Sequence, residues 1–171
     1  MNVLRTLDKW LVKIEEQILS YSIILIAIMV VGNVLSRELT GNSWAFSMEV
    51  SRFAVTVATF MGISYAARKG RHISMSAFYD MAPFPVRKAL AIFIPGLTAI
   101  VLFTLSVFAY DYFISLYESG RVTTALQVPV YTFAFFVPLG LVLGGIQFLR
   151  NMWVNIKEKE IYLAQERKDY S

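Results

Sequence analysis

Apolar and polar residues alternate in long blocks along this chain. Four blocks contain no charged residue, and they cover residues 18–36, 53–67, 89–110 and 122–149. A helix needs about 20 mostly apolar residues to cross a bilayer. The second block reaches that length if its helix begins near Trp44. The pattern therefore predicts an all-α integral membrane protein with four transmembrane helices, over residues 18–39, 44–67, 86–112 and 127–152.

Residues 1–17 follow a different pattern, with apolar side chains at three- and four-residue steps and charges at most other positions. This pattern favours an amphipathic helix that lies in the membrane interface before the first span. The alternative is a plain extension of the first span into the cytoplasm. Residues 153–171 are polar and predict a cytoplasmic tail, which we expect to continue the last helix and fray.

Turn-forming residues separate the predicted spans. Residues 40–43 read TGNS, in which Gly41 tolerates a positive φ and Ser43 can cap the second helix. Pro83 and Pro85 interrupt the chain before the third span, because a proline disfavours helix in the residue that precedes it.

The fourth span contains unusual residues for a membrane helix. Pro129 fits the first helical turn, where a missing N–H costs nothing. Pro138 lies in mid-span and predicts a kink, because it removes the hydrogen bond to the carbonyl of Ala134. Gly140 and Gly144 form a pair of small residues that lets another helix approach closely.

The positive charges gather in alternate segments of the chain. Only 16% of the residues are charged, against about a quarter in a soluble domain. Thirteen of the 16 cations lie in the N-terminal segment, between the second and third spans, or after the fourth span. Lysine and arginine collect on the cytoplasmic side, so both termini are predicted inside the cell. This reading is preferred to a nucleic-acid partner for the basic pI of about 9.4.

The sequence offers little for catalysis. His72 is the only histidine and there is no cysteine, which excludes bis-histidine haem and thiolate metal sites within the chain. The adjacent carboxylates Glu15 and Glu16 are expected on a solvated helix face. Glu49 and Arg52 are three residues apart, so they can pair with each other or contact another helix or subunit. No ionisable residue lies deep in a span, where a transport site would be expected.

Two segments resemble the small membrane subunit of tripartite ATP-independent periplasmic (TRAP) transporters, the DctQ-like family. The first is MEVSRFAVTVATFMGISYAARKGRHISM, and the second is TTALQVPVYTFAFFVPLG. The positions of the first segment that match the family are Glu49, Arg52, Gly62, Arg68, Gly70, His72 and Ile73. Those of the second are Thr123, Ala125, Leu126, Pro129 and Pro138.

The resemblance implies a division of labour between three proteins in a bacterial inner membrane. A large multi-span subunit would carry the substrate and sodium sites, and a soluble periplasmic protein would capture an organic acid such as a C4-dicarboxylate or sialic acid. The small subunit would extend the scaffold and help to dock the periplasmic protein. No cofactor, metal or substrate site is then expected in this chain, whose partners would be these two proteins and membrane lipids.

Two other functions compete with a scaffold subunit. A self-sufficient small transporter or channel, working as a homo-oligomer, would need a polar group at mid-membrane. A membrane anchor for a redox complex would be recognised by the visible absorption of haem or flavin. The charge pattern also predicts that three neighbouring cations hold the topology and bind lipid headgroups rather than substrate, namely Arg68, Lys69 and Arg71.

Overall fold

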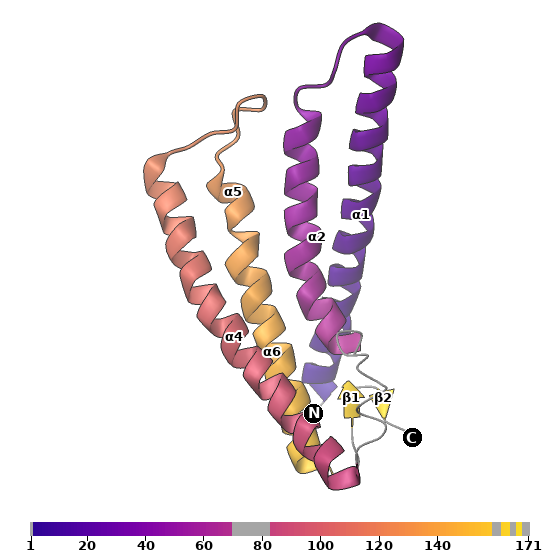
Figure 1. Ribbon diagram of the computed structural model, residues 1–171, viewed down its shortest axis with the longest axis vertical. Helices are drawn as coiled ribbons and strands as arrows, with labels where there is room; N and C mark the ends of the chain where they lie inside the picture. The colour runs from indigo at the N-terminus through magenta and orange to yellow at the C-terminus, as the bar shows by residue number, and fades with distance from the viewer. Residues whose placement is uncertain (1, 70–82, 159–161, 165–166, 169–171) are drawn as a thin grey trace.

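The computed structural model describes residues 2–69, 83–158, 162–164 and 167–168 (Figure 1). The expected contributions of Gly70, Arg71, His72 and Ile73 lie outside these residues. The described elements are α1 (Asn2–Thr40), α2 (Ser47–Lys69), α4 (Phe84–Ser119), α5 (Tyr131–Ala134), α6 (Phe136–Lys157), β1 (Tyr162–Ala164) and β2 (Arg167–Lys168). Four helical stretches are long and apolar enough to cross a membrane, and they cover Val12–Thr40, Ser47–Arg68, Phe84–Ser119 and Tyr131–Lys157.

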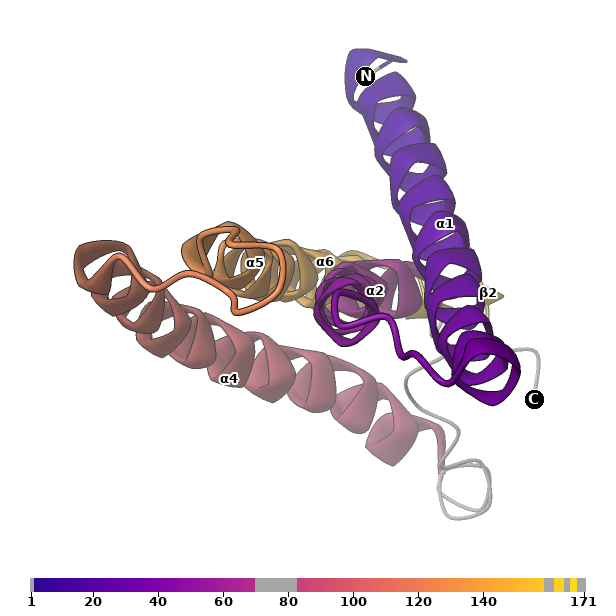
Figure 2. The ribbon, with the colours of Figure 1, turned by 90° about the horizontal axis from the view of Figure 1, so that it is seen from above.

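The four long helices form a row rather than a closed bundle. α1 packs on α2, α2 packs on α6, and α6 packs on α4 (Figures 1 and 2). We call the end with the loops at residues 41–46 and 120–130 the loop end, and the opposite end, where α1 begins and α6 finishes, the terminal end (Figure 1). A row leaves much of each outer helix without a neighbour, so apolar surface remains exposed.

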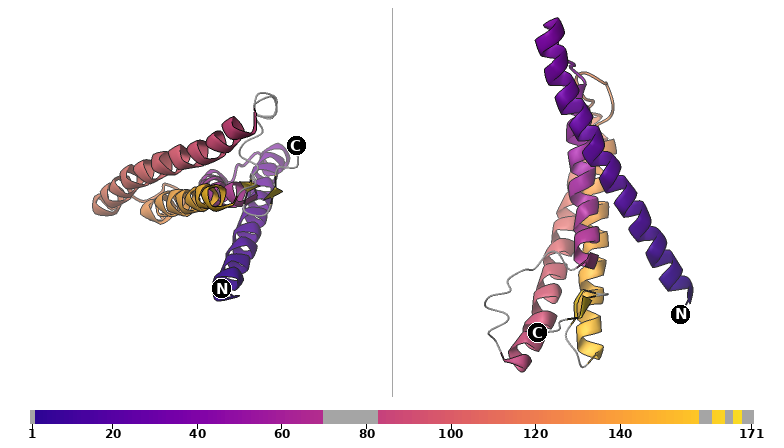
Figure 3. Two further views of the ribbon diagram at one scale, coloured as in Figure 1. Left: turned by 90° about the horizontal axis from the view of Figure 1, so that it is seen from below. Right: turned by 90° about the vertical axis from the view of Figure 1, so that its right-hand side faces the viewer.

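The expected separate helix over residues 1–17 does not form. α1 runs without a break from Asn2 to Thr40, as the alternative of an extended first span predicted. Nothing in the sequence around residue 17 ends a helix, because neither glycine nor proline lies there. Figure 3 shows α1 crossing α2, with its N-terminal turns leaning away from the other helices.

The connection from α1 to α2 is folded back onto α1. Gly41 has φ 72°, a left-handed conformation that ends the helix, and its N–H donates to the carbonyl of Arg37. The Trp44 N–H then donates to Asn33 Oδ1 at 2.7 Å, and the Trp44 ring covers Gly32, where a Cβ would lie 2.7 Å from it. α2 begins only at Ser47, so the expected cap at Ser43 is wrong.

The helix of the fourth span is interrupted close to Pro138, while the kink expected at that residue stays a prediction. The break between α5 and α6 falls at Phe135, three residues before the proline. The backbone dihedrals of Phe135 stay helical, at φ −56° and ψ −36°, so the chain continues in nearly the same direction. Pro138 itself is buried, and its carbonyl lies 3.4 Å from the hydroxyl of Ser106 on α4.

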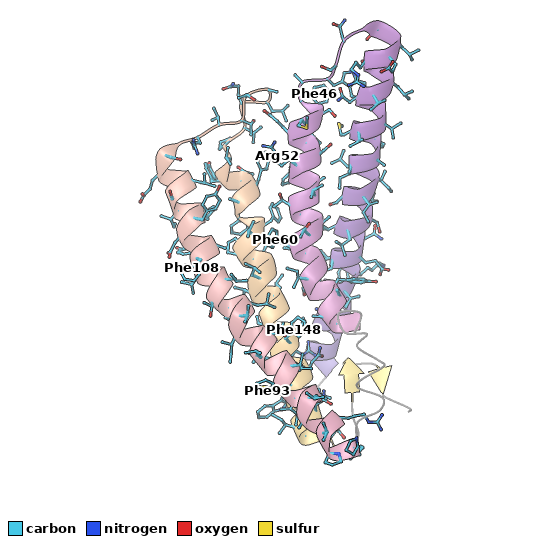
Figure 4. The ribbon with its side chains drawn as sticks, in the orientation of Figure 1. Phe46, Arg52, Phe60, Phe93, Phe108 and Phe148 are labelled. Carbon is cyan, nitrogen blue, oxygen red and sulfur yellow. The ribbon has the colours of Figure 1, made fainter. Side chains whose placement is uncertain are left out.

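Glycines let α6 pack tightly against both of its neighbours. A Cβ at Gly140 would fall on the backbone carbonyl of Phe60 in α2, and one at Gly144 would lie 2.6 Å from the Ile63 side chain. Gly145 faces the ring of Phe103 in α4 in the same way, at 3.0 Å. Figure 4 shows Phe60 near mid-length of α2 and Phe148 nearer the terminal end. α6 is therefore held closely on two sides, by α2 and by α4.

The tail does not extend α6 as expected. α6 ends at Lys157, and β1 and β2 follow as a short antiparallel pair that aligns Tyr162 with Lys168. The Lys88 side chain, in the first turns of α4, donates to the carbonyl of Glu158 at 2.6 Å. This bond ties the end of α6 to the beginning of α4.

Gly140→Ala should destabilise the protein by about 1–3 kcal/mol, because the added methyl group overpacks a backbone contact that cannot relax easily. Thermal unfolding in detergent micelles, followed by circular dichroism, measures the effect. Gly62→Ala is the matched control, since its Cβ would meet Leu19 at an ordinary 3.5 Å. Equal unfolding midpoints for the two variants would contradict the close approach of α2 and α6.

Candidate functional site

The carboxylate of Glu49 holds the loop that joins α4 to α5. Its Oε1 accepts the N–H of Ala125 at 2.7 Å and the hydroxyl of Thr124 at 3.0 Å. Its Oε2 accepts the N–H of Leu126 at 2.9 Å. A carboxylate that accepts several such bonds fixes both the position and the conformation of the groups that donate them.

The loop presents these donors because it folds as a small hairpin. The N–H of Thr123 donates to the carbonyl of Val128, and that of Val130 donates to the carbonyl of Arg121, both at 2.9 Å. At the turn, Gln127 takes the left-handed φ of 55°, which directs its neighbours' backbone. The amides that precede it are thereby free of the hairpin's own bonds and point to Glu49.

This contact replaces the expected pair between Glu49 and Arg52. Arg52 is exposed on α2 near the loop end (Figure 4), and the described bonds of Glu49 all go to the loop. The other expectation for Glu49 was contact with another helix or subunit, whereas its partners lie in a loop of the same chain. The two segments that carry the family resemblance therefore meet in space, Glu49 from the first and Thr123 to Leu126 from the second.

A second polar cluster joins α1 to α2 near the terminal end. Ser64 donates to Glu15 Oε1 at 2.7 Å, and Arg68 Nη2 lies 3.8 Å from Glu15 Oε2. Both charged side chains are only 5% exposed. The expectation of a solvated Glu15 is therefore wrong, and so is that of Arg68 as a headgroup ligand. Glu15 faces α2 because α1 continues as a helix through this region.

α6 adds three buried amides next to this cluster. Gln147, Asn151 and Asn155 are spaced by four residues and share one helix face, and all are buried. Asn151 donates to the carbonyl of Ala67 at 3.0 Å. That carbonyl belongs to the last turn of α2, where the helix itself supplies no donor. The spacing of these amides was visible in the sequence, and it signalled a helix contact that sequence reasoning missed.

Other residues that the sequence singled out lie in helix contacts or in the hairpin. Gly62 of α2 faces Leu19 of α1, and Gly144 of α6 faces Ile63 of α2. Pro129 pairs with Val122 in the hairpin, and the helix begins only at Tyr131, so the expected place of Pro129 in the first helical turn is wrong. Among the described residues, no group of three or more His, Asp or Glu side chains could hold a metal ion. What the two polar clusters can do is fix helix ends and loops in place.

Comparison with known proteins identifies relatives of the whole arrangement. Residues 26–158 match the family described as tripartite ATP-independent periplasmic transporters, DctQ component. The chain is also similar to the ectoine TRAP transporter small permease protein TeaB of Halomonas elongata, at 40% identity over 162 residues. The aligned region covers 95% of this chain and 84% of that protein. Glu49 and the hairpin both lie within the region that matches the family.

Glu49→Ala should release the hairpin, because two backbone N–H groups lose their acceptor. We expect amide hydrogen exchange at Ala125 and Leu126 to become about tenfold faster, measured by mass spectrometry in detergent micelles. Arg52→Ala and Glu118→Ala are controls at the same end, each removing one exposed charge. Faster loop exchange in Arg52→Ala would instead support a pair between Glu49 and Arg52.

Arg68→Ala should destabilise the packing of α1 on α2 by about 3–5 kcal/mol, because it removes the guanidinium that lies beside the buried carboxylate of Glu15. Replacing Glu15 by Gln in the same chain should restore part of the lost stability. Denaturant unfolding in mixed micelles measures the cycle, and Glu16→Gln, at an exposed neighbouring carboxylate, is the control. Additive effects of the two changes would show that Glu15 and Arg68 are not coupled.

Proposed function

Because the chain belongs to the DctQ-component family of tripartite ATP-independent periplasmic transporters, as its sequence predicted, we propose that it is the scaffold for a large transport subunit. It is the small permease subunit of a TRAP transporter and a transport protein rather than an enzyme. The family implies two partners, a large membrane subunit and a substrate-binding protein. The scaffold role goes beyond membership of the family, and the arrangement of the helices in a row supports it.

The single observation that supports a scaffold most strongly is how the polar groups are used. Glu49 binds the hairpin, Glu15 binds α2, and Asn151 binds the end of α2. Each of these side chains holds one part of the chain to another, near an end of the row. An organic anion at mid-membrane would need polar groups of its own, because an uncompensated charge there is costly.

The exposed apolar surface supports a large partner in the membrane. In the most apolar 18-residue stretch of the first span, only 6% is buried within the chain, whereas 44% of the corresponding stretch of the last span is buried. The row leaves α1 and α4 with open faces. Phe108 on α4 shows this plainly, with 65% of its surface exposed on the side away from α6 (Figure 4).

The cargo and its coupling remain part of the proposal. The family resemblance suggests a sodium-coupled symporter for a C4-dicarboxylate or sialic acid, and the name of the Halomonas relative adds ectoine. All of these carry a carboxylate, so we propose a small carboxylate-bearing solute as the cargo. We place the sodium and substrate sites in the large subunit, in the bacterial inner membrane, with both termini of this chain in the cytoplasm.

Liposomes test the scaffold directly. The purified chain, given a sodium gradient, a binding protein and labelled ectoine, C4-dicarboxylate or sialic acid, should take up no more label than empty liposomes. Adding the large subunit should start uptake of one of the three. Uptake by this chain without the large subunit would sink the scaffold proposal in favour of a self-sufficient small transporter.

A further inference from the structure

One exposed face of the fourth span changes character along its length. Phe135, Leu139 and Ile146 are exposed and apolar, and one turn further come the exposed side chains of Arg150, Trp153 and Lys157. The steps between these residues are three, four and seven, so all of them lie on one face of the helix. This stripe therefore runs from an apolar upper part to a cationic and aromatic lower part at the terminal end.

A cavity of about 420 Å³ opens beside the apolar part of the stripe. It is lined by Val107, Tyr110 and Phe113 of α4 and by Phe135, Leu139 and Val142 of the fourth span. Nearer the terminal end the same two helices are in close contact, at Gly145 with Phe103 and at Gly96 with Met152. The cavity is thus the place where α4 and α6 begin to separate (Figure 1).

The distance between the two parts of the stripe matches one membrane leaflet. From Arg150 to Leu139 the helix rises about 16 Å, at 1.5 Å per residue. Half of the hydrocarbon core measures about 15 Å. If the cations lie at the headgroups, the cavity lies where an acyl chain of that leaflet ends. Trp153 would then lie at the interface, the depth that tryptophan prefers.

We propose that this stripe binds one phospholipid with an anionic headgroup. Arg150 and Lys157 hold the phosphate, Trp153 packs against the glycerol region, and one acyl chain follows Ile146 and enters the cavity beside Leu139. A molecule with a negative head and a long apolar tail matches both the cationic and the apolar part of the stripe.

The charge around the cationic part favours this occupant. Arg87 and Lys88 lie in the first turns of α4, at the same end of the row, and add positive potential. Glu158 is the neighbouring carboxylate and opposes part of this potential, and its backbone carbonyl accepts a bond from Lys88. Basic sites between membrane helices are known to select anionic headgroups, at about 1 kcal/mol for each lysine or arginine near the surface.

Binding of single lipids to the full chain tests the headgroup contact. The delipidated protein is titrated with dioleoylphosphatidylglycerol or dioleoylphosphatidylcholine and the bound lipids are counted by native mass spectrometry. We expect preference for the anionic lipid, and a loss of about tenfold or more in its affinity for the Arg150→Gln/Lys157→Gln variant. Arg37→Gln/Arg121→Gln removes the same charge at the loop end and should change nothing.

A second arm tests the acyl chain. Val142→Phe or Leu139→Trp fills the cavity. Either change should lower the affinity for dioleoylphosphatidylglycerol several-fold. The affinity for dihexanoylphosphatidylglycerol should stay the same, because its short chains do not reach the cavity. Circular dichroism confirms that each variant is folded. Equal losses in both charge variants, or no preference for the anionic lipid, would overturn the proposal. So would a photocrosslinker at position 153 that labels the large subunit instead of lipid in the assembled transporter.

Discussion

A backbone N–H or C=O group inside a bilayer must find its hydrogen bond within protein, and the ends of helices are where such bonds are lacking. In this protein, side chains from other helices supply such bonds to the end of α2 and to the loop that joins α4 to α5. Glu49 reaches from α2 to the amides of the hairpin, and Asn151 reaches from α6 to the carbonyl of Ala67. Each bond satisfies a backbone group and, at the same time, fixes the position of one helix relative to another. The two ends of α2 are therefore also the places where the row of helices is held together.

The features that depend on composition and period could be predicted from the sequence. The uncharged blocks indicated four spans, and Gly41 indicated the end of α1. The family was recognised from the short segments around Glu49 and Thr123. Each of these signals is local, because it depends on residues that are neighbours along the chain.

The contacts of the polar side chains could not be predicted, because they join distant segments. Glu49 and Ala125 are 76 residues apart, and Glu15 and Ser64 are 49 apart, so no spacing rule connects them. The nearer cation, Arg52, was the natural partner for Glu49 by helix periodicity, but backbone amides compete better when a hairpin presents them in pairs. Arg68 shows a related limit. Its charge was read as a mark of membrane topology, yet the same guanidinium is buried against Glu15.

The order of the helices in the row differs from their order in the chain. Among the described helices, α4 comes next after α2 along the chain, but α6 lies between them in space. During synthesis, α1 and α2 can pair as soon as they leave the ribosome, whereas α4 must wait for a partner that has not yet been made. Until α6 arrives, the face of α2 that carries Phe60 and Ala67 is open to lipid. The last long helix to be translated is thus the one that joins α4 to the pair of α1 and α2, and a chain cut short before it would lack this connection.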